Sequence, residues 1–278
     1  MGASKPIKMV FADMDGTFVA TDKSVPLKNL CALDALANFG IPFVPCTGRP
    51  VSAVPQEIWG HRATRYGIGA NGAVIQDAVT GERLHVESIQ KDAVLELYER
   101  VRGLNATFDV FADGRVYAER WRYDAMGSYG IDAPTLDVLR KVRQPVDLDV
   151  PHLVERAQAI EKITCFWKSE DDRAGLLKAI EGMSGFSSSH GHPKNFELQA
   201  SGVSKGYALA WLCGHTGIPT SDVVAFGDES NDVSLLEAAG TGVAMQNAIP
   251  EVLSVADATT TSNDEAGVAY FLERALSY

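Results

Sequence analysis

The sequence predicts an α/β fold in which a parallel-sheet core is interrupted by an inserted α+β segment. Two observations predict the core: short apolar runs alternate with helical patterns at both ends of the 278-residue chain, and polar clusters follow the apolar runs. A third observation predicts the insert, because the middle of the chain carries strand-like runs joined by a hairpin signal. Strands that alternate with helices are joined by right-handed crossovers and lie parallel.

The N-terminal region predicts a strand, a helix and a second strand. Ser24 is the expected N-cap of the helix, Pro26 suits its first turn, and Gly40 marks its end. The elements expected in order are a strand at 7–12, a helix up to residue 40, a strand at 41–46 and a turn at 47–50 that leads into a further helix.

The same alternation returns near the C-terminus. A short strand at 196–199 precedes Lys205, and the remaining elements follow it. They are a helix at 204–216, a strand at 222–226, a turn at 227–231, a helix at 232–239, a strand at 241–245 and a last helix at 265–276.

The middle of the chain differs, because two strand-like runs meet at Asp113-Gly114, a strong signal for a two-residue hairpin turn. The elements expected here are a helix at 91–102, strands at 107–112, 115–120 and 162–167, and a helix at 172–181. We therefore expect a core domain formed by residues 1–82 and 191–278, and an inserted domain formed by residues 83–190.

Composition excludes several classes of function. The 25 basic and 36 acidic residues give a formal net charge of −11, which disfavours nucleic acids and anionic membranes as partners. We find neither a signal-peptide pattern nor an apolar run of membrane-spanning length. The four cysteines are widely spaced, which favours free thiols in a reducing cytoplasm. A monomer and a small homo-oligomer both remain open.

Four polar clusters follow predicted strands, and the carboxyl edge of an open α/β sheet is where ligands bind. They are Asp13 with Asp15, Thr47, Lys205, and Asp228 with Asn231 and Asp232. If Asp13, Asp15 and Asp228 converge, each pair of carboxylates ~5 Å apart repels by roughly 3 kcal/mol at an effective dielectric of ~20. A divalent cation would compensate, and ligands that are all oxygen atoms suit Mg²⁺ better than Zn²⁺.

Four ordered motifs resemble those of the haloacid dehalogenase superfamily, and most closely its Cof-type sugar-phosphatase branch. They are Asp13-Met14-Asp15-Gly16-Thr17, Cys46-Thr47-Gly48-Arg49, Ser204-Lys205-Gly206 and Gly227-Asp228-Glu229-Ser230-Asn231-Asp232. Residues 242–248 and 261–269 extend the similarity. The resemblance implies a Rossmann-like core that performs the chemistry and a cap domain, at 83–190, that reads the substrate.

The resemblance also implies a role for each site residue. Asp13 would be the nucleophile that forms an aspartyl-phosphate. Asp15 would protonate the leaving alcohol and later deprotonate water, for which its pKa should exceed that of Asp13. Asp13, Asp228 and the Asp15 carbonyl would bind Mg²⁺. Thr47, Gly48, Lys205 and Asn231 would bind the phosphate group. Asp232 would orient metal waters or Lys205.

The expected function is therefore Mg²⁺-dependent hydrolysis of a small phosphorylated metabolite, with a sugar phosphate as the usual class in the resembled branch. Two rivals use the same residues: a phosphomutase or phosphotransferase, and a regulator that binds a sugar phosphate without catalysis. A phosphomutase or phosphotransferase would pass the phosphoryl group of the aspartyl-phosphate to a sugar hydroxyl. A regulator would show no turnover.

Three other patterns have simpler interpretations. Residues 67–72 match Gly-x-Gly-x-x-Gly, but a predicted strand follows where a dinucleotide site needs a helix. His190 and His192 could share a face and hold a metal, yet the sequence offers no third ligand. The aromatic residues Trp121, Tyr123 and Tyr129 favour a small core over a wall facing a sugar.

Overall fold

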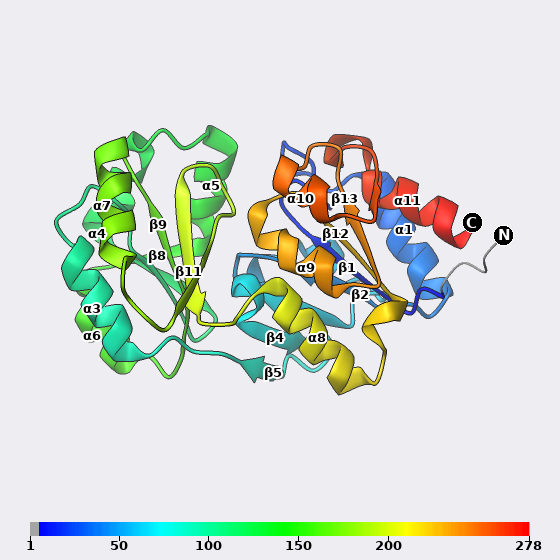
Figure 1. The fold of residues 1–278 in the computed structure, drawn as a ribbon, viewed down its shortest axis with the longest axis horizontal. Helices are drawn as coiled ribbons and strands as arrows, with labels where there is room; N and C mark the ends of the chain where they lie inside the picture. Colours follow the sequence, from blue (N-terminus) through cyan, green and yellow to red (C-terminus); the bar gives the residue numbers. More distant parts are fainter. Residues whose placement is uncertain (1–5, 278) are drawn as a thin grey trace. The chain divides into compact units, whose positions relative to one another are not determined.

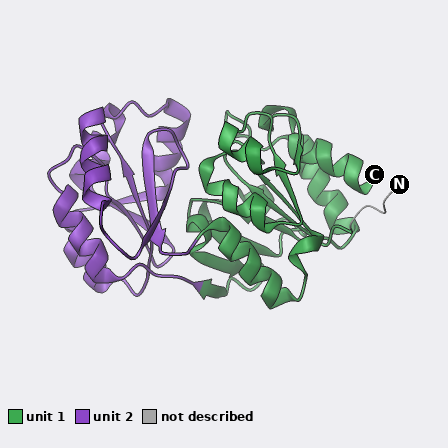
Figure 2. Cartoon of the chain, viewed as in Figure 1, with its two compact units in different colours: residues 1–85, 204–278 green, residues 86–203 purple. Residues whose placement is uncertain are grey.

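A computed structural model describes residues 6–277, and the chain forms two compact units (Figure 2). Unit 1 contains the chain up to His85 and again from Ser204 onward, whereas unit 2 is the continuous segment Val86–Val203. The predicted core and insert had their boundaries at residues 82 and 190. Residues 1–5 of the predicted core, and residue 278, lie outside the part that is described.

Unit 1 is built on an eight-stranded sheet in the order β14-β13-β12-β1-β2-β3-β4-β5 (Figure 1). Neighbouring strands from β14 to β3 run parallel, and β4 pairs antiparallel with β3. The strands are β1 (Met9–Asp13), β2 (Phe43–Cys46), β3 (Tyr66–Gly69), β4 (Val74–Asp77), β5 (Arg83–Val86), β12 (Val223–Gly227), β13 (Thr241–Ala244) and β14 (Ala258–Thr259).

Helices cover both faces of this sheet, which explains why its strands are apolar on both sides. Along β1, Val10 and Ala12 pack into one buried cluster with α1 and α11, whereas Met9 and Phe11 pack into another with α8, α9 and α10. The helices are α1 (Leu27–Asn38), α2 (Gln56–Trp59), α8 (Lys205–Thr216), α9 (Val233–Ala238), α10 (Pro250–Val255) and α11 (Gly267–Leu276). Short 3-10 turns are η1 (Val51–Ala53), η2 (Ala70–Gly72), η4 (Thr220–Asp222), η5 (Ser230–Asp232) and η6 (Asn263–Glu265).

Unit 2 is an α+β structure with a six-stranded sheet in the order β10-β11-β9-β6-β7-β8. Its strands pair antiparallel except for β7 with β8. The strands are β6 (Asp109–Ala112), β7 (Arg115–Glu119), β8 (Arg143–Val146), β9 (Ile160–Phe166), β10 (Phe186–Ser189) and β11 (Asn195–Ala200). The helices are α3 (Lys91–Val101), α4 (Arg120–Ala125), α5 (Ala133–Val142), α6 (Val150–Arg156) and α7 (Glu170–Ile180), with the 3-10 turn η3 (Met126–Ser128).

The predicted hairpin is present, because Asp113 and Gly114 join β6 to β7 with φ values of +52° and +80°. Two positive φ values in succession are what a tight turn between twisted strands requires. The α/β class with a parallel-sheet core and an α+β insert is therefore confirmed.

Three expectations about local structure were wrong. The strand expected at 196–199 as part of the core is β11, which pairs antiparallel with β9 in unit 2. Ser24 does not cap α1, whose N-cap is Pro26, because the Ser24 hydroxyl donates to Asp22 instead. The helix expected after residue 50 is only η1 and α2, since Pro55 keeps the preceding Val54 extended.

Candidate active site

The chain order of unit 1 brings three polar loops to one edge of its sheet. Strand β1 lies between β12 and β2, and Asp13 is paired in register with Cys46, the residue before Thr47. Because these strands are parallel, the loops after β1, β2 and β12 all leave at the carboxyl edge. Asp13, Thr47 and Asp228 are thus brought together, as the sequence predicted.

Lys205 enters this edge from the first residue of α8. The hydroxyl of the N-cap Ser204 accepts a hydrogen bond from the Tyr207 amide at 3.1 Å, which fixes the start of the helix. The Lys205 side chain is completely buried, and its Nζ lies 2.6 Å from Oδ1 of Asp13 and 2.6 Å from Oδ1 of Asp232. Burial acts to lower the pKa of Lys205, but the two carboxylates outweigh burial and raise it, so Lys205 is a cation.

Three buried carboxylates form a cluster beside this ammonium group, and two of them contact it. Asp13, Asp228 and Asp232 each offer an oxygen atom within 4.8 Å of the others. Burial, opposed by Lys205 and reinforced by Asp232 and Asp15, raises the pKa of Asp13 to about 7. Burial, together with Asp13 and Asp232, also raises the pKa of Asp228 well above its usual value. The site therefore has more negative charge than its own cation can balance.

Asp228 and Asp232 are held by different partners. The Thr17 hydroxyl donates to Oδ1 of Asp228 at 2.6 Å. Asp232 Oδ2 accepts the backbone N–H groups of Asp228 and Glu229 at 3.1 and 3.2 Å, while its other oxygen accepts from Lys205. Asp232 thus fixes the turn after β12 and the position of Lys205, whereas Asp228 has no ion pair among residues 6–277.

The donor set fits a hard divalent cation. The grouped atoms are carboxylate oxygens, and no cysteine or histidine belongs to the group among residues 6–277. The expected set of converging carboxylates was partly wrong: the third member of the cluster is Asp232, whereas the Asp15 side chain lies with two cations. The Asp15 assignment as a metal ligand concerned its backbone carbonyl, so this finding leaves that assignment as a prediction.

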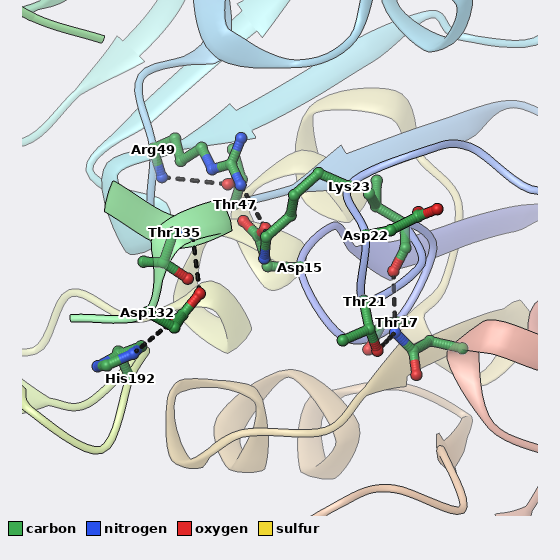
Figure 3. Close-up of polar contacts among 12 residues, drawn as sticks. Asp15, Thr17, Thr21, Asp22, Lys23, Thr47, Arg49, Asp132, Thr135 and His192 are labelled. Atoms are coloured by element: carbon green, nitrogen blue, oxygen red, sulfur yellow. Dashed lines mark hydrogen bonds and ion pairs between the residues drawn. The ribbon is translucent and has the colours of Figure 1, made fainter. Parts of the chain in front are cut away.

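Two basic side chains hold the Asp15 carboxylate (Figure 3). Lys23 Nζ lies 3.0 Å from Oδ1 of Asp15, and the Arg49 guanidinium donates to the same oxygen. Burial acts to raise the pKa of Asp15, but Arg49 and Lys23 outweigh burial and lower it. We expected the pKa of Asp15 to exceed that of Asp13, and the structure gives the reverse order because the cations lie beside Asp15.

The turn after β2 supplies groups suited to an anion. Thr47 is buried, its amide donates to Ile68 O at 2.9 Å, and its hydroxyl accepts from the Arg49 amide at 3.1 Å. Gly48 lies between Thr47 and Arg49 in this turn. These bonds fix the backbone of the turn beside the carboxylates.

Asn231 lies in the loop after β12 and faces a residue from η2. Its side-chain nitrogen donates to Oδ1 of Asn71 at 3.2 Å, which orients the amide. The oxygen of the same amide is buried without a hydrogen-bond partner, which is costly unless a ligand or water satisfies it. Asn231 is therefore poised toward a further partner.

Gly16 shows why the first motif needs glycine. Its φ is +83°, and a Cβ atom at this position would lie 2.2 Å from Oδ2 of Asp228. Any side chain would therefore clash with a carboxylate of the cluster and also strain the backbone. The chain can turn tightly after Asp15 only with glycine here.

Several site residues received no role from the sequence. Asn247 Nδ2 donates to the Gly16 carbonyl at 2.8 Å and lies 3.5 Å from Oδ2 of Asp228. The Asn263 amide in turn donates to Oδ1 of Asn247 at 3.1 Å. Both asparagines belong to the two outer segments of similarity, which was the only available signal. Lys23 had no signal at all.

The alternative patterns carry no second site. His192 Nε2 lies 3.3 Å from Oδ2 of Asp132 (Figure 3). His190 Nδ1 lies 2.6 Å from Asn195 O, so the two rings have separate protein partners. Residues 67–72 continue through η2 into β4, without the helix of a dinucleotide site. The expected aromatic core was partly wrong, because Tyr129 is buried but Trp121 is 53% exposed.

No helix among residues 6–277 is long and apolar enough to cross a membrane.

Comparisons with known proteins agree with this geometry. A family model described as haloacid dehalogenase-like hydrolase matches residues 10–272. The chain is 32% identical to the phosphatase YwpJ of Bacillus subtilis, over 97% of this chain and 100% of the relative. It is 28% identical to a B. subtilis 5-amino-6-(5-phospho-D-ribitylamino)uracil phosphatase, YwtE, over 98% of this chain and 99% of that relative.

A solved structure of a haloacid dehalogenase-like hydrolase from B. subtilis is similar over 96% of this chain and 99% of that chain, with a TM-score of 0.81 and 30% identity. Both the sequence and the fold thus match along nearly the whole chain, and the relatives that carry a named activity are phosphatases. The chain belongs to the haloacid dehalogenase-like hydrolases, and it is a phosphatase of the Cof type.

Proposed function

We propose that this protein is a Mg²⁺-dependent phosphomonoesterase that hydrolyses a small sugar or sugar-alcohol phosphate through an aspartyl-phosphate on Asp13. The observation that carries the proposal is the position of Asp13: it is buried beside Lys205, and it shares the carboxylate cluster with Asp228. A carboxylate between an ammonium group and a cation site is suited to attack phosphorus, because the transferred group carries negative charge throughout.

The first chemical step forms a bond between an Asp13 oxygen and phosphorus and breaks the bond from phosphorus to the alcohol oxygen. Asp15 gives its proton to that departing oxygen. The Lys23 and Arg49 pairs favour the ionised form of Asp15, whereas the negative charge of a bound phosphoryl group acts in the opposite direction. In the second step water attacks phosphorus, Asp15 takes its proton, and inorganic phosphate leaves Asp13 free.

The phosphoryl oxygens need donors that are in place before the reaction. Thr47 hydroxyl, the Gly48 amide, Lys205 Nζ and the Asn231 amide are the groups we assign to them. The hydrogen bonds that fix the Thr47 turn and orient Asn231 support this assignment, since preorganised donors stabilise the transition state most.

Asp13, Asp228 and the backbone carbonyl of Asp15 would hold Mg²⁺, with Asp232 orienting Lys205 and the metal waters. When bound, Mg²⁺ supplies charge stabilisation for the phosphoryl group. The cluster of buried oxygen donors, which exceeds its one ammonium group in charge, supports this choice.

The substrate class rests on a relative. YwtE is named for a substrate whose phosphate ends a ribityl chain, so that its leaving group is a primary alcohol. The site groups of unit 1 recognise only a phosphoryl group, and we assign the choice of leaving group to unit 2. We also place the enzyme in the cytoplasm, because its four cysteines are free thiols.

The experiment that tests this proposal compares wild type with Asp13→Asn. We expect Mg²⁺-dependent release of phosphate from para-nitrophenyl phosphate and from members of a panel of sugar phosphates. The Asp13→Asn variant should lose about 10⁴-fold or more in kcat, because the nucleophile is gone. Wild type without turnover on any phosphomonoester would refute the proposal and favour the regulator.

A phosphotransferase uses the same aspartyl-phosphate, and the first experiment does not separate it from a phosphatase. Product analysis does, since a phosphatase yields free phosphate equal to the substrate consumed. Accumulation of an isomerised or transferred sugar phosphate in place of free phosphate would contradict hydrolysis as the main reaction.

A further inference from the structure

The loop between β1 and α1 carries a basic residue into the site from outside the four motifs. Lys23 Nζ lies 3.0 Å from Oδ1 of Asp15, the oxygen that also accepts from Arg49 (Figure 3). Asp22, the neighbour of Lys23, does not compete for this ammonium group, because its carboxylate accepts the amide and hydroxyl of Ser24 at 2.9 and 2.6 Å. The Lys23 charge is thus directed to Asp15.

The backbone at Lys23 is held in an unusual conformation to achieve this. Its φ is +71°, in the left-handed region that residues other than glycine rarely adopt. The Lys23 amide donates to Ala20 O at 2.9 Å, and the Ala20 amide donates to Ser24 O at 2.9 Å, which closes the turn. Strained residues of this kind concentrate at functional sites.

Residues from the far end of the chain anchor the same loop. Asp264 accepts the amide of Thr21 at 2.8 Å and its hydroxyl at 3.0 Å, and Asn263 Nδ2 donates to Val19 O at 3.1 Å. Lys23 therefore extends from a loop that is fixed on both sides of its turn.

Fold stability does not explain this arrangement. The Lys23 and Asp15 side chains are 25% and 31% exposed, and ion pairs that open to solvent contribute little to stability. We propose that Lys23 is a positioning residue that holds the Asp15 carboxyl group where it protonates the leaving alcohol. This inference rests on the proposed phosphatase function, and it adds a residue to that reaction.

Substrates with different leaving groups distinguish a positioning role of Lys23 from a general effect on the site. Para-nitrophenolate departs without a proton, whereas the alkoxide of a sugar phosphate needs one from Asp15. A misplaced Asp15 therefore slows formation of the aspartyl-phosphate from an alkyl phosphate more than from para-nitrophenyl phosphate. The ratio of kcat/KM for the two substrates measures this difference, because it reports the steps up to departure of the alcohol.

The test uses Lys23→Asn, since asparagine tolerates a positive φ and its short neutral side chain lacks the ammonium group. Lys23→Gly is a second variant that suits the same backbone, and Lys23→Arg keeps the charge. The matched control is Lys28→Asn, which removes an exposed lysine in the first turn of α1.

We expect Lys23→Asn and Lys23→Gly to lower kcat/KM about tenfold or more for the alkyl phosphate that wild type hydrolyses fastest, but less than about threefold for para-nitrophenyl phosphate. KM should change less than kcat, Lys23→Arg should recover most of the loss, and Lys28→Asn should match wild type. Equal losses on both substrates, or no loss, would overturn the role of Lys23 while wild-type turnover upholds the phosphatase. A wild type without turnover would overturn both.

Discussion

The two units both bury charge, but they balance it differently. In unit 2 each of three buried basic side chains is paired with its own carboxylate, at N···O distances of 2.7 or 2.8 Å; the pairs are Arg122–Glu119, Arg143–Asp109 and Lys162–Glu197. In unit 1 Lys205 pairs with both Asp13 and Asp232, and Asp228 of the same carboxylate cluster has no ion pair among residues 6–277.

This difference distinguishes buried charges that pair within the fold from buried charges that can bind a ligand. A matched buried pair gives each charge an opposite charge beside it. An unmatched cluster is stable only if some carboxylates hold protons or if a cation binds, which is why the pKa values of Asp13 and Asp228 are raised. The cluster of three buried carboxylates beside one ammonium group therefore marks the site in unit 1 independently of any motif.

Removal of Lys205 should produce the largest effect, because it deprives the cluster of its cation. We expect Lys205→Met to lower the free energy of unfolding in metal-free buffer by about 3–5 kcal/mol. We also expect kcat to fall by about 10²-fold or more, since the proposed mechanism assigns Lys205 as a donor to the phosphoryl group. Denaturant unfolding with EDTA and phosphate release measure the two losses.

The matched control lies in unit 2. Arg143→Met also leaves a buried carboxylate, Asp109, without its partner, so it should cost stability of the same order. It should leave Mg²⁺ affinity unchanged, as measured by calorimetry. If Lys205→Met alters neither kcat nor the response to Mg²⁺ more than Arg143→Met does, the two units do not differ in the way described.

The pH dependence of stability should differ between metal-free and Mg²⁺-bound protein. The folded chain binds a proton on Asp13 with a pKa of about 7, against a usual 3.8, so folding favours the protonated form. Stability of the metal-free protein must then fall as pH rises from about 4 through about 7, with Asp228 acting in the same direction. We expect a loss on the order of 2–4 kcal/mol between about pH 5 and 8, and recovery with Mg²⁺.

The other shifted groups do not cancel this trend. The lowered pKa of Asp15 stabilises the fold above its usual value of 3.8, so its contribution is complete by about pH 5. The raised pKa of Lys205 contributes fully at any pH below its usual 10.5. Thermal unfolding with EDTA across this range measures the slope, and Asp13→Asn should flatten it. A metal-free protein that gains stability with pH would contradict the imbalance.

A smaller effect is expected from Asn247, which supports the cluster without belonging to it. Asn247→Ala removes the donor to the Gly16 carbonyl and to Asp228, so Mg²⁺ affinity should weaken about tenfold. Titration calorimetry with Mg²⁺ measures this change. Unchanged Mg²⁺ affinity in Asn247→Ala would mean that other contacts fix the Gly16 carbonyl and Asp228. Asn247→Asp keeps the size of the side chain but adds a charge to an acidic site.

The strand ends were predictable because buried parallel strands are apolar throughout and their ends are marked by polar residues. Asp13, Thr47 and Asp228 could be located in this way, and their convergence follows from the sheet rule. The strand around Phe196 was assigned to the wrong sheet, since it pairs with β9 in unit 2. Periodicity identifies a strand but not its neighbours.

Two helices of unit 2 that were not predicted carry local signals for their first residues. Helices α5 and α6 each begin with an aspartate cap and a proline in the first turn, Asp132 with Pro134 and Asp149 with Pro151. By contrast, the contact of Lys23 with Asp15 depends on a loop conformation fixed by residue 264, which no local pattern encodes. Local sequence patterns thus indicate where helices begin, whereas they do not predict contacts between residues that are far apart in the chain.

The placement of β1 between β2 and β12 has a consequence for synthesis of the chain. Asp13 and Lys205 are 192 residues apart, and Thr17 and Asp228 are 211 apart. While the ribosome extends the chain, strand β1 must therefore wait with one edge unpaired until residues beyond β12 emerge. Unit 2, a continuous segment, has all its strands available earlier. The phosphatase thus gains its catalytic centre only near the end of translation, after its inserted unit is complete.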